Sequence, residues 1–259
     1  MICSCRPNLD RAQAMEVRSS RGAIFLTTIL MMMAQWCCWG VATQEAFDPT
    51  SGFTQLAFNC EIQKPYDLQV TDRFSFEAGV YDMWVLSTDN PYIEGSRTMP
   101  RCELHVVGLD YNSGVWQFEG DFFVASNISG ICIMQILADS KVTATALQVR
   151  VVDGNLLRYS GGLPTQTVAT MVSNQWVHLN VIHDADSKSI QIFVNDVLAH
   201  EELTNTYKNH YFKYGAAYTS NTSSPCIEVL WKNVAIWKKS TQINSEAIVA
   251  GGTASCFPQ

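Results

Sequence analysis

Short runs of alternating apolar and polar residues recur along most of the chain, and turn-forming residues separate them. A period of two is that of a strand with one buried face, whereas helical periodicity is hard to find. We expect strands over these ranges: Phe74 to Phe76, Val80 to Ser87, Arg101 to Val107, Val115 to Val124, Gly130 to Leu137, Ala144 to Val152, Trp176 to His183, Ser189 to Val194, Lys213 to Tyr218 and Val229 to Trp237. Regular spacing of short strands favours an all-β sandwich or jelly roll over a parallel α/β fold.

The stretch from Arg101 to Val107 has the most informative alternation. As a strand, it has one apolar face and one ionisable face, the latter carrying Arg101, Glu103 and His105. Burying unpaired ionised groups costs several kcal/mol each, so this face must meet water, a ligand or partners on neighbouring strands. One interpretation is an Arg101–Glu103 ion pair with no ligand, and another is a binding site.

Two hairpins are expected from the turn signals. Gly108 to Gly114 reads as a turn that returns Val115 to Phe123 beside the polar strand, and Asp184 to Lys188 joins the strands on either side of it.

Five tryptophans along the expected domain suit either a sandwich core or a surface on which sugar rings stack. The core is favoured for most of Trp84, Trp116, Trp176, Trp231 and Trp237.

Composition indicates one globular domain, which we place at residues 45–238 and expect to be monomeric. The chain has 259 residues, 47% of them hydrophobic, with a formal net charge of -7. This acidic balance argues against a nucleic-acid partner, which relies on a broad Lys/Arg surface. An anionic ligand would therefore need a local basic site.

Residues 1–44 are typical of a signal peptide. Arg18 and Arg21 precede an uncharged apolar run from Gly22 to Ala42, and small residues follow it. A signal anchor is the alternative, since about 20 apolar residues span a bilayer. We expect cleavage near Ala42 to Ala46, delivery to the extracellular space, cell wall or vacuole, and no membrane attachment afterwards.

Cysteines and glycosylation motifs also fit delivery through the secretory pathway. Asn127 and Asn221 each begin an Asn-X-Ser motif beside loop-forming residues. One or two disulfides are expected among five cysteines, with the pairing open: Cys60, Cys102, Cys132, Cys226 and Cys256. No close Cys/His spacing of the zinc kind occurs, and no metal or cofactor is expected. Residues 239–259 read as a tail without regular structure.

Six segments in order carry a resemblance to a known family. They are Ile62 to Asp67, Pro100 to Leu104, Ser113 to Gly120, Ser129 to Ile136, Asn180 to Asp184 and His210 to Gly215. Together they resemble the plant citrate-binding proteins, relatives of the alginate-lyase-2 type of polysaccharide lyases. The resemblance implies a concanavalin-A-like jelly roll whose concave sheet holds citrate or an acidic glycan.

The resemblance also implies site residues. It assigns ligand binding to residues of three motifs, namely Arg101, Glu103, Gln135, Tyr211 and Lys213. In the lyases the second motif ends in a histidine and the third contains a tyrosine. The corresponding positions here are Leu137 and Ala217, and Tyr218 comes one residue late. A one-residue slip turns a strand side chain to the other face, so Tyr218 would need a bulge to serve.

These residues allow three functions. Eliminating across a uronate requires a neutralised carboxylate and a base and acid within reach. Arg101, Gln135 and Lys213 suit the first need, whereas the second would depend on Tyr218 or on His105, which is alternatively a structural histidine. We therefore expect a non-catalytic secretory-pathway protein that binds citrate or an acidic glycan. A β-eliminating lyase is the alternative, and a cell-wall lectin is a third.

Overall fold

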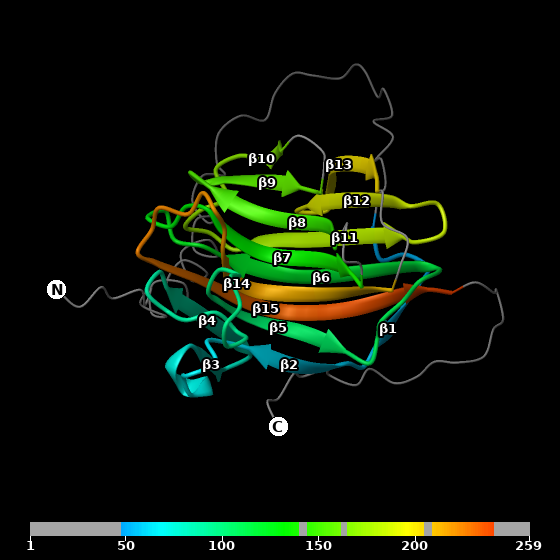
Figure 1. Cartoon of the computed structure of the whole chain (residues 1–259). Helices are drawn as coiled ribbons and strands as arrows, with labels where there is room; N and C mark the ends of the chain where they lie inside the picture. Colours follow the sequence, from blue (N-terminus) through cyan, green and yellow to red (C-terminus); the bar gives the residue numbers. More distant parts are fainter. Residues whose placement is uncertain (1–47, 140–143, 162–164, 205–208, 241–259) are drawn as a thin grey trace, which may run out of the picture.

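Two antiparallel sheets packed face to face form the molecule (Figure 1). The computed structural model describes residues 48–139, 144–161, 165–204 and 209–240. The eight-stranded sheet has the order β13 (Val197–Leu203), β12 (Ser189–Val194), β11 (Val177–Asp184), β6 (Val115–Phe123), β15 (Cys226–Lys239), β4 (Val80–Leu86) and β3 (Phe74–Glu77), and β1 (Phe53–Leu56) also pairs with β15. The seven-stranded sheet has the order β10 (Gln166–Ala169), β9 (Asn155–Tyr159), β8 (Thr145–Val152), β7 (Ile131–Ala138), β14 (His210–Tyr218), β5 (Arg101–Val107) and β2 (Asn59–Gln63).

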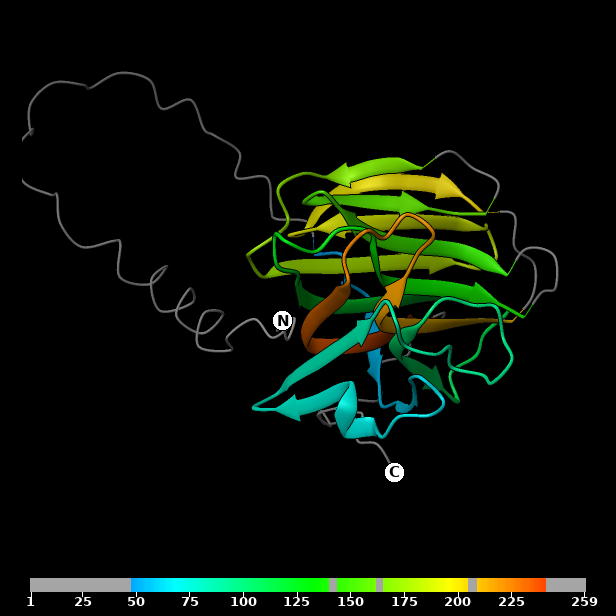
Figure 2. The ribbon, with the colours of Figure 1, turned by 60° about the vertical axis from the view of Figure 1, so that its left-hand side comes forward.

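The all-β sandwich expected from the alternation is confirmed. The one helical element of the described ranges is the 3-10 turn η1 (Val70–Asp72), close to β3 and β4 at the lower edge of the sandwich in Figure 2. In that part of the chain, no helix has the length and apolar character needed to cross a membrane. The leader, residues 1–44, lies outside the described residues, as does the expected tail of residues 239–259 from residue 241 onward. Lys239, placed in the tail from the sequence, instead ends β15.

Alternation along each strand fills the space between the sheets. Phe118 of β6, Tyr214 of β14 and Trp231 of β15 are essentially inaccessible to solvent. Their ring centroids are 5.4 to 5.8 Å apart, so aromatic contacts join the two sheets at the middle of the core. Trp84 and Trp116 are also buried, whereas Trp176 and Trp237 are partly exposed.

The expected hairpin between β5 and β6 is wrong. Both segments are strands with the expected bounds, but β5 pairs with β14 and β2 while β6 pairs with β11 and β15. The connection between them crosses from one sheet to the other. Tyr111 fixes this crossing, because it exchanges two backbone hydrogen bonds with His210 and stacks on Trp116 at 4.7 Å. Turn residues alone do not distinguish a hairpin from a crossover.

The second expected hairpin is confirmed, since β11 and β12 pair in register from Leu179–Val194 to Asp184–Ser189. The strands that the alternation did not predict are β1, β2, β9, β10 and β13. Most of β13 is exposed, including Val197 and Leu203. An edge strand with apolar residues facing water has no clear polar and apolar faces, so its sequence shows no period of two.

Two neutral histidines lie where β11 and β14 meet the crossover. The rings of His183 and His210 are 4.5 Å apart, and the Tyr111 hydroxyl is 2.8 Å from Nδ1 of His183. Burial, with a smaller contribution from His210, lowers the pKa of His183 to about 3. Burial also lowers the pKa of His210. Both side chains are therefore held in the uncharged form in the folded protein.

This burial predicts acid sensitivity. Because the folded-state pKa of His183 lies below its unfolded value of about 6.5, the unfolded chain binds the proton first as the pH falls. Stability is therefore fully present above about pH 6.5 and falls towards pH 3, by about 3 kcal/mol at pH 4.5 from this residue alone. We expect His183→Gln to reduce this loss, measured by urea unfolding at pH 7.5 and pH 4.5.

His178→Gln is the matched control. A hydrogen bond to Asp121 raises the pKa of His178, so its contribution has the opposite sign and is greatest in acid. The same acid loss in His183→Gln as in the wild type would contradict the interpretation.

Candidate functional site

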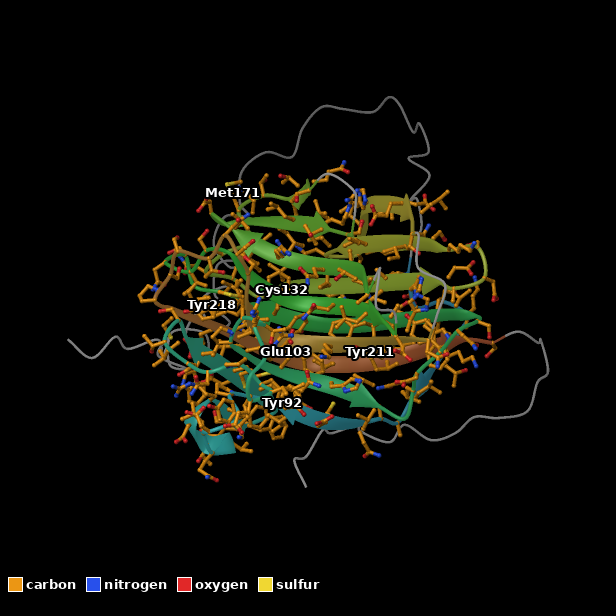
Figure 3. All side chains as sticks on the ribbon, viewed as in Figure 1. Tyr92, Glu103, Cys132, Met171, Tyr211 and Tyr218 are labelled. Atoms are coloured by element: carbon orange, nitrogen blue, oxygen red, sulfur yellow. The ribbon has the colours of Figure 1, made fainter. Side chains whose placement is uncertain are left out.

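A continuous row of polar side chains crosses the outer face of the seven-stranded sheet. Strand register places one residue from each of six neighbouring strands side by side, in the order Glu61, His105, Lys213, Gln135, Gln148 and Tyr159. We call these six residues the central row. In Figure 3 the labelled Glu103 and Tyr211 lie over the same region of the nearer sheet. Residues from distant parts of the chain therefore share one face.

Glu103 is the most deeply buried charged group of this face. Its side chain has no exposed surface, and it accepts a hydrogen bond from Nε2 of Gln135 on β7 and one from Nη1 of Arg101 at 3.3 Å. Gln148 then donates to Oε1 of Gln135 at 2.9 Å. The carboxylate thus orients both amides and the guanidinium. The Arg101–Glu103 ion pair weighed above does form, within one strand rather than across two.

Gly215 allows β14 to approach the backbone of β5 closely beside Glu103. It lies opposite Glu103 on β14, the strand between β5 and β7. Its φ is +143°, and a Cβ built there would lie 2.5 Å from the Cys102 carbonyl oxygen. Any other residue would force β5 and β14 apart. The close approach of the two strands at this point therefore requires glycine.

Lys213 is a nearly buried cation that forms no ion pair within the described ranges. It is 7% exposed, and its Nζ donates to Oε1 of Gln63 at 2.6 Å. Burial lowers the pKa of Lys213, whereas the charge of Glu103 acts to raise it.

His105 and Tyr211 lie together beside Lys213. Their ring centroids are 4.6 Å apart, and Nδ1 of His105 is 3.6 Å from Glu61. Burial and then the charge of Lys213 lower the pKa of His105, with a smaller opposing effect of Glu61. The charged imidazolium of His105 is therefore disfavoured, and its neutral imidazole can accept a proton. Burial raises the pKa of the Tyr211 hydroxyl, which stays protonated.

Tyr218 faces the interior. A bulge does interrupt the pairing of β14 with β7 between Tyr214 and Ala217, but pairing with β5 stays regular there. Tyr218 consequently belongs to the core, and its hydroxyl donates to the Ser224 carbonyl at 3.0 Å. This geometry argues against the catalytic role considered for Tyr218. The two positions that the resemblance assigns to proton transfer do lie on the polar face, but they carry Leu137 and Ala217.

Four residues of this neighbourhood were not identified from the sequence: Gln63, Tyr159, Glu61 and Tyr92. The Tyr92 hydroxyl donates to Glu61 at 2.5 Å from the loop before β5. Gln63 belongs to the segment Ile62 to Asp67, which supported the family resemblance and was the available signal. Tyr159 lies on β9, a strand that the alternation did not predict. No group of histidine, cysteine and acidic side chains within the described ranges could hold a metal ion.

The cysteines divide into two kinds. Cys60 and Cys226 each take part in a disulfide, whereas Cys102 and Cys132 are free and buried. Cys256 lies outside the described residues. Asn127 and Asn221 are exposed, in neighbouring loops joined by a hydrogen bond from the Ser224 hydroxyl to the Asn127 carbonyl. Both asparagines are accessible for modification.

Comparison with known proteins identifies the family. The family model described as alginate lyase matches residues 58–238, and the chain belongs to this family. A citrate-binding protein of Hevea brasiliensis is 39% identical over 199 residues, which cover 76% of this chain and 82% of that protein. The resemblance to this family is thereby confirmed.

Solved structures agree on the fold. Alginate lyase A1-II', a member of polysaccharide lyase family 7, superposes with a TM-score of 0.57 at 13% identity, over 71% of this chain and 96% of that one. An alginate lyase of Pseudomonas aeruginosa gives a TM-score of 0.54 at 18% identity, over 70% of this chain and 97% of that one. The fold is therefore the jelly roll of these lyases.

Replacement of Gly215 is predicted to disrupt the polar face. Gly215→Ala should lower the free energy of unfolding by about 3 kcal/mol, because the methyl group meets the backbone of β5. Gly79→Ala is the matched control, since Gly79 has a positive φ of +81° but no atom within 4 Å of its built Cβ. Gly79→Ala should lower the free energy of unfolding by about 1 kcal/mol. Urea unfolding measures both, and equal costs would show that the close approach has no role.

Proposed function

We propose that this protein binds a carboxylate ligand, citrate or a uronate glycan, on the polar face of the seven-stranded sheet. The observation that carries the proposal is Lys213, a nearly buried cation whose hydrogen-bond partner is the neutral amide of Gln63. The chain has a net charge of -7, so acidic side chains were available as partners. Burying a cation without an anion is costly, and an anionic ligand offsets that cost.

Neighbouring groups suit a carboxylate. Arg101 has a part-exposed guanidinium with a fork geometry, and its buried Nε has no hydrogen-bond partner within the described ranges. Glu103 already orients this guanidinium and the Gln135 amide, so the ligand would meet preorganised donors. The Hevea relative is named for citrate binding, and the structural neighbours are named as alginate lyases. Both ligand classes carry carboxylates.

Binding without turnover is favoured over elimination. The positions matched to the lyase histidine and tyrosine are Leu137 and Ala217, which transfer no protons. Arg101, Gln135 and Lys213 are retained. The binding half of the family's site is thus present and the proton-transfer half is replaced.

Citrate should bind the wild type and stabilise it against heat, since a ligand that favours the native state raises its stability. Arg101→Gln should weaken the affinity at least tenfold, because a charged hydrogen bond contributes about 1.5–3 kcal/mol. The citrate affinity of Arg101→Lys should lie between that of the wild type and that of Arg101→Gln. Isothermal titration calorimetry measures all three proteins, and circular dichroism checks that each is folded. Affinity unchanged in Arg101→Gln would contradict the assigned site.

A lyase is the competing candidate, favoured by neutral His105 beside Tyr211 and Lys213. In such a site His105 would accept the proton and the Tyr211 hydroxyl would donate one to the leaving group. Incubation with glucuronan or alginate distinguishes the candidates through the absorbance of unsaturated uronate ends. Product formed by the wild type and lost in His105→Gln would replace binding with catalysis as the function.

We also propose that residues 1–44 direct the chain into the secretory pathway and that the vacuole or cell wall is its destination. The apolar leader and the two exposed sequon asparagines support this proposal. Full-length protein expressed in plant cells should carry glycans at Asn127 and Asn221. Enzymatic deglycosylation should then lower its apparent mass, and Asn127→Gln and Asn221→Gln should each remove one step. An unshifted band in the wild type would contradict secretory delivery.

A further inference from the structure

A second row crosses the same sheet beside the central row and has a different composition. Strand register aligns Arg101 on β5 with Ala217 on β14, Ala217 with Cys132 on β7, and Cys132 with Arg150 on β8. We call these four residues the arginine row. Its two ends are cationic and its middle carries small uncharged side chains. Since neighbouring strands are about 4.8 Å apart, the two arginine Cα atoms are separated by about 14 Å.

Arg150 has only neutral partners among the described residues. Its Nε donates to Oε1 of Gln148 at 2.9 Å, Nη2 donates to the same oxygen, and its guanidinium carbon lies 3.9 Å from the centre of the Tyr159 ring. No ion pair of those residues includes it. The aromatic ring and the amide fix the orientation of the guanidinium without neutralising its charge.

Both arginines act on the centre of the row. Burial and then Glu103 raise the pKa of the Cys132 thiol, whereas Arg150 and Arg101 both oppose this rise. The two positive charges are therefore close enough to be felt at one sulfur atom. Figure 3 shows Cys132 on the same part of the sheet as Glu103.

The centre of the row carries the small side chains of Ala217 and Cys132, which are 2% and 1% exposed. The family resemblance matches the position of Ala217 to a tyrosine, and a phenol here would stand between Arg101 and Arg150. Neighbouring Gly215 cannot carry a side chain, because its built Cβ meets the backbone of β5. The two positions between Arg101 and Arg150 thus carry the small side chains of Ala217 and Cys132.

We propose that the arginine row is a two-point carboxylate site, in which Arg101 and Arg150 each hold one carboxylate of a ligand lying over Ala217 and Cys132. The inference rests on the proposed function and narrows its ligand class to molecules with two or more carboxylates. Citrate and a short chain of linked uronates both have this chemistry. A ligand with a single carboxylate engages Arg101 and leaves Arg150 free.

Titration calorimetry of the full chain tests the second point of attachment. Arg150→Gln should bind citrate at least tenfold more weakly than the wild type and bind D-glucuronate, which has one carboxylate, with unchanged affinity. Arg150→Lys should recover part of the loss, since it keeps the charge without the fork. Arg101→Gln should weaken both ligands. Lys238→Gln is the control, because it removes an exposed charge from the eight-stranded sheet. It should change the affinity for neither ligand.

A second variant tests the centre of the row. Ala217→Leu keeps every charge and should weaken citrate binding at least tenfold by placing a larger side chain between the arginines, with circular dichroism confirming the fold. Repeating the titrations with diglucuronate shows whether citrate or a uronate chain is the better ligand. The ligand that spans the arginine row better should bind more tightly.

The outcomes separate the two proposals. Citrate binding in Arg150→Gln within twofold of the wild type, combined with a loss in Arg101→Gln, would overturn the two-point site and leave the proposed function standing. Equal weakening of citrate and D-glucuronate by Arg150→Gln would also overturn it. A wild type that binds none of these ligands would refute both.

Discussion

The buried carboxylate of Glu103 is the constraint on which the polar face depends. It lies on β5, reaches over Gly215 of β14 and accepts a hydrogen bond from Gln135 of β7. A fully buried charge must be hydrogen-bonded, and here its donors are the groups proposed to hold the ligand. The requirement that stabilises the sheet therefore also orients the Arg101 guanidinium and the amides of Gln135 and Gln148.

Charge distribution separates this face from the rest of an acidic protein. Arg73 and Arg158 form short ion pairs with Asp89 and Glu202, at 2.6 Å each, as expected where a guanidinium serves structure. Lys213 and Arg150 instead lie beside neutral amides and aromatic rings. Cations kept near neutral partners retain their attraction for anions. This contrast separates Arg73 and Arg158 from Lys213 and Arg150, whereas Arg101 combines an ion pair to Glu103 with a proposed ligand contact.

Under the proposed function, carboxylate binding and proton transfer use different positions of one scaffold. The proposed binding needs fixed donors, which β5, β7 and β14 supply. Proton transfer needs a base and an acid at two further positions, and these hold Leu137 and Ala217. In the proposed two-point site, the small side chain of Ala217 separates the two arginines, at the position that the resemblance matches to a tyrosine.

Much of this protein was determined locally by its sequence. The alternation from Arg101 to Val107 separated a polar face from a core face, and the same period located most strands, because a half-buried strand requires it. The family resemblance named Arg101, Gln135 and Lys213. Strand pairing was decided only by the tertiary structure: β5 and β6 have hairpin-like spacing yet belong to different sheets, since pairing depends on how the whole core closes. Tyr218 faces the interior because β14 keeps its register with β5, and Arg150 joins Arg101 only through two intervening strands. Contacts between residues far apart in sequence follow from sheet order, and no local pattern records that order.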